Sequence, residues 1–364
     1  MVLTRTKARL ERVSFHVASV FGLLSPRTQR RLARGGPVVI DGNTLDPGIQ
    51  LLLATRRRLG ARPWHVQTPR QARSAMAAEA RLGSVRPTEV GSVEDVEVAG
   101  ADGPLRARHY TPPAACGEAQ PLLVYLHGGG FVMGDLDAYD SVCRILCRHA
   151  GVHVLSVDYR LAPEHPFPAA VHDAVAALGW AFEHAAELGA DAARVAVGGD
   201  SAGGNLAATT ARLATRDGAP VPALQLLIYP ATDVESDWPS RTLFADGPYL
   251  LTTADVEFFQ HHYMGEAAGD DPLGSPLLAG DLSGLPPALV VTAGFDPLRD
   301  EGEAYARALR DAGSPVILRR FAELVHGFVN LAAINPASHD ALVEVAGGVR
   351  VLLALHTDDT RRGT

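Results

Sequence analysis

Short apolar runs alternate with amphipathic, helix-like stretches from about residue 90 onward. The runs Leu122–Leu126 and Ala288–Thr292 are almost continuously apolar, as expected of strands covered on both faces. Such alternation is typical of a mostly parallel sheet flanked by helices. The expected strands are Val93–Val98, Arg106–Tyr110, Leu122–Leu126, Val152–Val157, Arg194–Val197, Leu224–Ile228, Ala288–Thr292 and Val316–Arg320. The helices expected between them include Asp140–Ala150, Pro168–Leu188, Asn205–Arg216 and Arg299–Ala312.

Two parts of the chain lack this pattern of strands. Residues 1–88 favour helices and loops, with Gln50–Gly60 and Arg70–Leu82 as helical stretches. A second block, at about residues 233–285, contains turns rich in Pro and Gly. Open α/β sheets bind ligands at the carboxyl ends of their strands, so we expect both blocks to form a helical cap over that edge. The predicted organisation is an N-terminal helical segment at 1–88, a main domain at 89–356 that carries the inserted block, and a flexible tail at 357–364.

The composition is that of a globular protein, with 364 residues, 47% hydrophobic and 20% charged. The formal charge of −8 argues against a nucleic-acid partner. No run approaches the roughly 18 apolar residues of a membrane-spanning helix. The chain has three cysteines, Cys116, Cys143 and Cys147. Cys143 and Cys147 lie one helical turn apart and are interpreted as buried thiols rather than as a metal pair or a disulfide framework. We therefore expect a cytoplasmic protein in a reducing compartment.

Residues 1–34 carry eight basic residues against one acid, Glu11. The apolar positions of this stretch recur at helical spacing, at Leu10, Val13, Val17, Val20 and Leu24. His16 interrupts them, and no small-x-small site precedes Pro26, so a secretory signal peptide is not expected. We favour a helix that packs its apolar face on the protein itself. Contact of residues 1–34 with a membrane surface is the alternative.

A G-x-S-x-G pattern at Gly199–Gly203 lies between the expected strand Arg194–Val197 and the expected helix Asn205–Arg216. A strand, a tight turn and a helix form the setting in which a serine is exposed as a nucleophile. The turn forces Ser201 into a strained backbone conformation, and the glycines on both sides avoid steric clashes. The N-terminus of the following helix favours negative charge here. The pattern alone is weak in a chain with 36 glycines, and its flanking elements make it specific.

A serine nucleophile needs a base and an acid that orients the base. The loops after the last two expected strands contain both, Asp296 in the first loop and His326 in the second. Ser201, Asp296 and His326 follow the chain order that this arrangement requires. Asp300 is a weaker candidate, because an acid in the first turn of a helix commonly matches the helix dipole. A role for Asp296 in a helix cap or an Asx turn is the structural alternative.

Three consecutive glycines follow His127 directly after the strand Leu122–Leu126. Ordering three glycines is entropically unfavourable, and a flexible loop is the ordinary interpretation. We favour a loop whose backbone N–H groups approach a reacting carbonyl and stabilise its oxyanion, with His127 fixing the loop by hydrogen bonds. The candidate oxyanion donors are Gly128, Gly129, Gly130 and Ala202.

Other chemistries are not indicated. The three glycines lack the G-x-G-x-x-G spacing of a dinucleotide fold and the Lys-Ser/Thr ending of a P-loop. No His, Cys and Asp residues share metal-ligand spacing. Asp233, Glu235 and Asp237 alternate with residues that do not build a calcium loop. Neither a metal nor another cofactor is therefore expected.

Several motifs, taken together, resemble the hormone-sensitive-lipase family of α/β-hydrolases, the bacterial family IV carboxylesterases, in their G-D-S-A-G branch. The matching segments are His127–Phe131, Asp158–Glu164, Gly199–Asn205, Asp296–Glu301 and His326–Phe328. The likeness extends over about residues 90–355. It implies an α/β-hydrolase fold, in which an eight-stranded, mostly parallel sheet is flanked by helices and covered by a helical cap built partly from the N-terminus.

The resemblance implies a catalytic triad of Ser201, Asp296 and His326 and a structural role for Asp158–Glu164. It also implies a cofactor-free serine carboxylesterase that hydrolyses short- to medium-chain acyl esters, small-molecule substrates, through an acyl-enzyme. A deacetylase or amidase on the same triad is the alternative. A non-catalytic small-ligand receptor is disfavoured because all three triad residues are present. Homodimers are common in this family, so a homodimer is a further expectation.

Apolar residues near these motifs are the expected lining of the substrate pocket, although each also suits core or cap packing. The candidates are Phe131, Val132, Tyr249, Leu250, Phe258, Leu324 and Phe328. Protonation of His326 removes the base, so activity is expected to fall near or below about pH 6.5.

Overall fold

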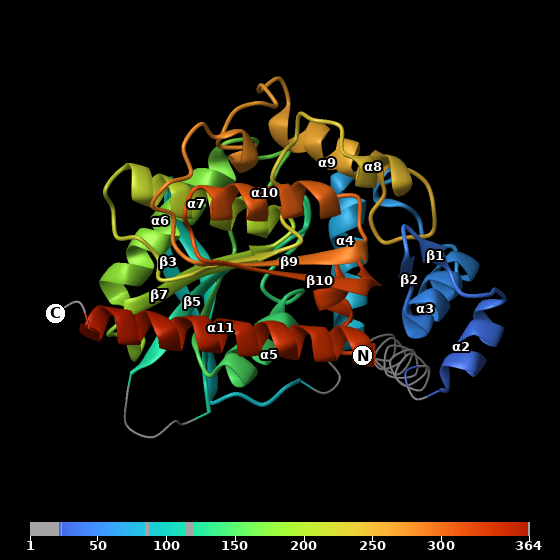
Figure 1. Ribbon diagram of the computed structural model, residues 1–364, viewed down its shortest axis with the longest axis horizontal. Helices are drawn as coiled ribbons and strands as arrows, with labels where there is room; N and C mark the ends of the chain where they lie inside the picture. Colours follow the sequence, from blue (N-terminus) through green and yellow to red (C-terminus); the bar gives the residue numbers. More distant parts are fainter. Residues whose placement is uncertain (1–21, 23, 84–86, 114–118, 363–364) are drawn as a thin grey trace, which may run out of the picture.

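A computed structural model describes residues 22, 24–83, 87–113 and 119–362 (Figure 1). Its main sheet contains β3 (Ser92–Gly100), β4 (Gly103–Thr111), β5 (Gln120–Leu126), β6 (His153–Val157), β7 (Ala190–Asp200), β8 (Gln225–Ile228), β9 (Ala288–Phe295) and β10 (Val316–Val325). The eight strands lie in the order β10-β9-β8-β7-β5-β6-β4-β3. β4 pairs antiparallel with β3 and β6, and the other neighbours pair parallel. The prediction of an eight-stranded, mostly parallel α/β fold is therefore confirmed.

Helices cover both faces of this sheet (Figure 1). α5 (Asp140–Ala150) and α11 (Pro336–Arg362) lie on one face. α6 (Ala169–His184), α7 (Ala202–Arg216) and α10 (Arg299–Asp311) lie on the other. Side chains of β5 alternate between the two resulting cores, with Val124 in one and Tyr125 in the other. Burial on both faces explains why β5 and β9 are continuously apolar in the sequence.

The two blocks without a strand pattern lie at one end of the sheet. The first block contains α2 (Pro26–Ala33), β1 (Val39–Ile40), β2 (Asn43–Thr44), α3 (Pro47–Arg58), η1 (Trp64–Val66) and α4 (Pro69–Gly83). The second contains α8 (Pro239–Leu243), α9 (Thr253–Met264) and η2 (Pro276–Leu278). The arrowheads of β9 and β10 point toward the end occupied by α3, α4, α8 and α9 (Figure 1). This arrangement supports the expected cap over the carboxyl edge of the sheet.

Some element boundaries differ from those expected. α7 begins at Ala202 rather than Asn205, because two glycines of low helix propensity open a helix that tertiary packing stabilises. α11 continues to Arg362, so most of the segment expected to be a tail is helical. Most of the apolar positions that suggested a basic N-terminal helix lie outside the described residues. Within the described part of the chain, no helix is both long and apolar enough to cross a bilayer.

The segment Asp158–Glu164 connects the sheet to the cap. The hydroxyl of Tyr159 donates to the His127 carbonyl at 2.6 Å. The guanidinium of Arg73, on α4, donates to both carboxylate oxygens of Glu164 at 2.9 and 2.6 Å. Arg73 Nε also donates to the Val132 carbonyl at 2.7 Å. These contacts agree with a structural role for the segment, because they hold the loop after β5 against the N-terminal part of the cap.

A buried ion pair stabilises the same region. Asp173, on α6, has a fully buried side chain and accepts from Arg160 Nε at 2.8 Å and Nη2 at 2.9 Å. Its carboxylate also accepts from the backbone N–H groups of Ala101 and Arg160, both at 3.1 Å. Removal of this carboxylate would leave Arg160 Nε and Nη2 and two backbone N–H groups without this acceptor.

We therefore expect Asp173→Ala to lower the free energy of unfolding by about 3–5 kcal/mol. Asp102 offers a matched control, because it contacts the same Arg160 at 3.2 Å but its side chain is 81% exposed. Asp102→Ala should cost about 1 kcal/mol or less. Urea denaturation of both variants measures the difference, and equal destabilisation would contradict this account.

Candidate active site

The turn between β7 and α7 presents Ser201 at the carboxyl edge of the sheet. Its backbone has φ 55° and ψ −118°, a conformation that residues other than glycine rarely adopt. A Cβ atom at Gly203 would lie 1.8 Å from the Leu126 carbonyl oxygen, and one at Gly199 would lie 2.3 Å from it. Only glycine fits at both positions, so the G-x-S-x-G spacing follows from the close approach of this turn to the end of β5.

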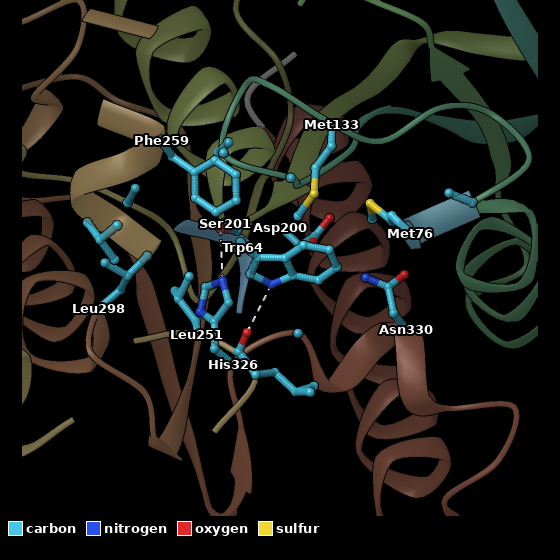
Figure 2. A pocket seen from close by; sticks show the side chains of 18 of the residues that line it. Trp64, Met76, Met133, Asp200, Ser201, Leu251, Phe259, Leu298, His326 and Asn330 are labelled. Carbon is cyan, nitrogen blue, oxygen red and sulfur yellow. Dashed lines mark hydrogen bonds between the residues drawn. The ribbon is translucent and has the colours of Figure 1, made fainter. Parts of the chain in front are cut away.

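His326 links Ser201 to Asp296. Its Nε2 lies 2.9 Å from Ser201 Oγ, and its Nδ1 lies 2.8 Å from Asp296 Oδ2 (Figure 2 shows the serine–histidine bond). Asp296 is fully buried, and its other oxygen accepts from the Leu298 N–H at 2.7 Å. Asp300 instead accepts from the Ser240 N–H and Arg299. The three side chains thus form a continuous hydrogen-bond chain, with the acid that sequence reasoning preferred.

The glycine loop after β5 lies beside Ser201. Gly129 and Gly130 have φ of 120° and 61°, in the left-handed range that glycine tolerates. His127 fixes the loop, since its Nδ1 lies 2.8 Å from the Gly128 carbonyl and its ring stacks on Tyr159 at 4.4 Å. The Gly128 N–H donates to Asp200 Oδ1 at 2.9 Å. That amide is therefore already used, which is a correction to its expected role as an oxyanion donor.

Asp200, directly before the nucleophile, is a residue whose role sequence reasoning missed. Its carboxylate is 1% exposed and accepts hydrogen bonds from the Gly128 amide and from three tyrosine hydroxyls. The tyrosines are Tyr125 at 2.9 Å, Tyr139 at 3.2 Å and Tyr229 at 3.3 Å. The second position of G-x-S-x-G carries no such signal by itself, because the partners of Asp200 come from separate segments of the chain.

A cavity of about 430 Å³ opens at Ser201 and His326. Its walls come from the glycine loop, the N-terminal block, the inserted block and the residues after His326. The cap residue Phe259 packs so closely on the loop that a Cβ at Gly130 would lie 2.2 Å from its ring. Most of the lining side chains are apolar, which suits the hydrocarbon part of a small organic molecule.

Two of the seven expected pocket residues, Phe131 and Leu250, line this cavity. The other five do not. Val132, Leu324 and Phe328 are completely buried in the core, Tyr249 packs on Phe244 and Phe295, and Phe258 contacts His262. On α9, the neighbour Phe259 faces the cavity instead. The correction has a simple reason, since proximity in sequence to a motif does not determine which side of a helix or strand faces the cavity.

Trp64 is the main lining residue that the sequence did not reveal. In Figure 2 its indole lies beside the serine–histidine pair, with Phe259, Leu251 and Leu298 on one side and Met76 and Asn330 on the other. Its Nε1 donates to the Leu250 carbonyl at 3.1 Å. The next residue, His65, donates from its backbone N–H to Asp255 Oδ1 at 2.9 Å, and its Nδ1 lies 2.8 Å from the same oxygen. Three hydrogen bonds therefore join η1 to the inserted block.

An ion pair forms the polar part of the cavity wall. Glu301 is fully buried and accepts from Arg241 Nη2 and from the Thr232 N–H, each at 2.8 Å. Burial raises the pKa of Glu301 to about 7, and the charge of Arg241 opposes the shift. The pair holds α8 and the segment after β8 against α10, which fixes this wall of the cavity.

The fold, the strained serine and its histidine–carboxylate partners define an α/β hydrolase. A family model described as the alpha/beta hydrolase fold matches residues 123–330. The chain belongs to the hormone-sensitive-lipase-like branch of these hydrolases, family IV, as the motifs predicted.

Two curated relatives illustrate the similarity. Carboxylic ester hydrolase LipN of Mycobacterium tuberculosis is 48% identical over 338 residues, which cover 90% of this chain and 88% of that protein. Ethyl acetate hydrolase of Pseudomonas putida is 40% identical over 304 residues, which cover 82% of this chain and 94% of that protein. Among solved structures, the hyperthermophilic esterase of Pyrobaculum calidifontis superimposes with a TM-score of 0.78 at 40% identity, over 83% of this chain and 97% of that one. The chain is accordingly a carboxylic ester hydrolase.

The bonds between η1 and α9 generate a prediction about the cap. We expect His65→Ala to accelerate amide hydrogen exchange in residues 62–67 about ten-fold, because a hydrogen bond to a charged acceptor contributes about 1.5 kcal/mol. Exchange followed by mass spectrometry measures the effect. His261→Ala is the matched control, since His261 lies exposed on the same α9 helix. Equal exchange rates in the two variants would show that His65 does not hold η1 on the cap.

Proposed function

We propose that the chain is a serine carboxylesterase that works through an acyl-enzyme, with Ser201 as nucleophile, His326 as base and Asp296 as its orienting acid. The observation that supports this proposal is the continuous Ser201–His326–Asp296 hydrogen-bond chain, whose first two residues line the cavity. Asp296 accepts from Nδ1–H, which leaves the Nε2 lone pair facing the serine hydroxyl. This tautomer is the one that removes a proton from Ser201.

In the first half-reaction, the Ser201 Oγ–H proton passes to His326 Nε2 as Oγ attacks the ester carbonyl carbon. The carbonyl π electrons move to oxygen and form a tetrahedral oxyanion. Collapse of this intermediate breaks the bond to the alcohol oxygen, which takes the proton from His326. Water repeats the sequence on the acyl-enzyme and releases the carboxylic acid.

We assign the oxyanion donors to the backbone N–H groups of Gly129, Gly130 and Ala202. Ala202 is the first residue of α7, where N–H groups and the helix dipole favour negative charge. The positive φ of both glycines is needed to turn the loop at this point. Each well-aimed donor is worth about 3–4 kcal/mol of transition-state stabilisation.

We propose short- to medium-chain acyl esters as substrates. The cavity of about 430 Å³ supports this range, because it accommodates a small ester but not a triglyceride with three long chains. The apolar lining on both sides of Trp64 offers separate space for the acyl and alcohol groups. One relative, from Streptomyces hygroscopicus, is named an acetyl-hydrolase. Deacetylation or amide cleavage on the same triad therefore remains the alternative reaction.

The environment of the protein is a further proposal. Cys143 and Cys147 are buried and free, and burial raises the pKa of both thiols, to about 12 for Cys147. Unreactive thiols suit the cytoplasm that we infer. The homodimer and the contact of residues 1–34 with a membrane surface also stay predictions, which light scattering and vesicle co-sedimentation would test.

The triad predicts the behaviour of three variants. Ser201→Ala should abolish hydrolysis of p-nitrophenyl butyrate and labelling by a fluorophosphonate. Asp296→Asn should lower kcat by about 10³–10⁴-fold, because the imidazole then loses its preferred tautomer. Asp300→Asn is the matched control and should change kcat less than ten-fold. Activity of Ser201→Ala comparable to that of the parent would overturn the mechanism.

The position of Trp64 predicts a change in selectivity. Trp64→Ala should raise kcat/KM for p-nitrophenyl octanoate relative to the acetate several-fold, because removal of the indole joins the spaces on its two sides. Steady-state kinetics over an acyl series from acetate to decanoate measure this ratio. Trp180→Ala is the control, since Trp180 stacks on His184 of α6, away from the cavity. An unchanged ratio in Trp64→Ala would exclude this residue as a determinant of chain length.

A further inference from the structure

The Asp200 carboxylate is a buried charge that the reaction just described does not use. It lies directly before the nucleophile and is 1% exposed. No ion pair to Asp200 is found in the part of the chain that the structure describes. A buried carboxylate without a cation is unfavourable by several kcal/mol unless hydrogen bonds compensate. The groups around Asp200 must therefore compensate for the burial of its charge.

Four donors converge on this carboxylate. Oδ1 accepts from the Tyr125 hydroxyl and the Gly128 N–H, both at 2.9 Å. Oδ2 accepts from the hydroxyls of Tyr139 at 3.2 Å and Tyr229 at 3.3 Å. Burial raises the pKa of all three tyrosines well above its ordinary value, so they remain protonated donors. Burial raises the pKa of Asp200 as well, and the hydrogen bonds from Tyr125 and Gly128 oppose that shift because they favour the ionised carboxylate, which only accepts.

One of these bonds determines the position of the glycine loop. The Gly128 N–H is held by Asp200 Oδ1, and a Cβ at Gly128 would lie 2.5 Å from Asp200 Oδ2. The loop is thus pressed against the carboxylate immediately before the two proposed donors, Gly129 and Gly130. A donor contributes fully only when its N–H points at the place where the oxyanion forms.

Two other bonds lead from Asp200 to the base. The ring of Tyr229, whose hydroxyl bonds to Asp200, lies 4.5 Å from the imidazole of His326. The hydroxyl of Tyr139 accepts from Asn330 Nδ2 at 3.3 Å, and Asn330 belongs to η3 (Phe328–Leu331), directly after the histidine loop. Asp200 thus places a carboxylate one tyrosine ring away from the imidazole of His326.

We propose that Asp200 is a positioning residue of the esterase reaction, which aims the oxyanion donors through Gly128 and fixes the His326 imidazole through Tyr229. This inference rests on the proposed function. The substitution Asp200→Asn keeps the size of the side chain but removes the charge and turns one acceptor into a donor. Either the tyrosine hydroxyls turn to accept from the new NH2 group, or the Gly128 N–H loses its acceptor.

Steady-state kinetics with p-nitrophenyl butyrate from pH 5 to 9 test the proposal. Asp200→Asn should lower kcat about 10- to 100-fold with KM changed less than about three-fold, because the loss is in the transition state. The midpoint of the acid limb of kcat/KM should move to lower pH by about half a unit or more, since a negative charge near the imidazole is lost. A purely structural role would leave that midpoint unchanged.

The other titratable groups near Asp200 and His326 are the same in the parent and in Asp200→Asn. They are Asp296 and Tyr229 beside His326, and Tyr125, Tyr139, Tyr159 and His127 around Asp200. Tyr125→Phe is the matched control, because it removes one donor and keeps the charge. It should lower kcat less than Asp200→Asn and leave the acid limb in place. A shift of the acid limb in Tyr125→Phe would contradict the assignment of that shift to the Asp200 charge.

Tyr229→Phe keeps the proposal testable if Asp200→Asn does not fold. It retains the ring against His326 and removes the hydroxyl on Asp200, so kcat should fall several-fold with an unchanged KM. Parental kcat in Asp200→Asn or Tyr229→Phe, with Ser201→Ala inactive, would overturn this inference and leave the esterase mechanism intact. Activity in Ser201→Ala would instead overturn the mechanism itself.

Discussion

The contact between the β7–α7 turn and the end of β5 is the constraint on which the site depends. Gly199 and Gly203 let the turn approach the Leu126 carbonyl more closely than any side chain would permit. Ser201 and the glycine loop therefore start from neighbouring strands at one point of the sheet. The rigid core, rather than the loops alone, sets the distance between the nucleophile and the N–H groups that face it.

Buried carboxylates organise the rest of the site. Asp296 orients the histidine, Asp200 gathers three tyrosines and a glycine amide, and Glu301 joins α8 to α10. Asp255 both caps α9 through Thr252 and receives His65. Each of these groups is buried and accepts several hydrogen bonds, which offsets the unfavourable desolvation of its charge. The two oxygens of each carboxylate thereby connect elements that are distant in sequence.

The sequence predicted the sheet, its helices and the three residues of the candidate triad, because strong local patterns mark them. Apolar runs identify buried strands, and loops directly after them carried Ser201, Asp296 and His326. The pocket was predicted poorly, since Trp64 and Phe259 face the cavity only through packing between segments almost 200 positions apart. Asp200 was missed for the same reason. Its partners have no common spacing in the chain.

The cap is assembled from two segments that are joined through η1 and α9. Trp64 donates a hydrogen bond to the Leu250 carbonyl of the inserted block. The Asp255 carboxylate, in the first turn of α9, also binds His65. Neither segment is therefore an independent module. An exchange of one block with a homologous enzyme would transfer only one side of these contacts. Joint transfer of residues 26–83 and 233–285 would keep both sides together.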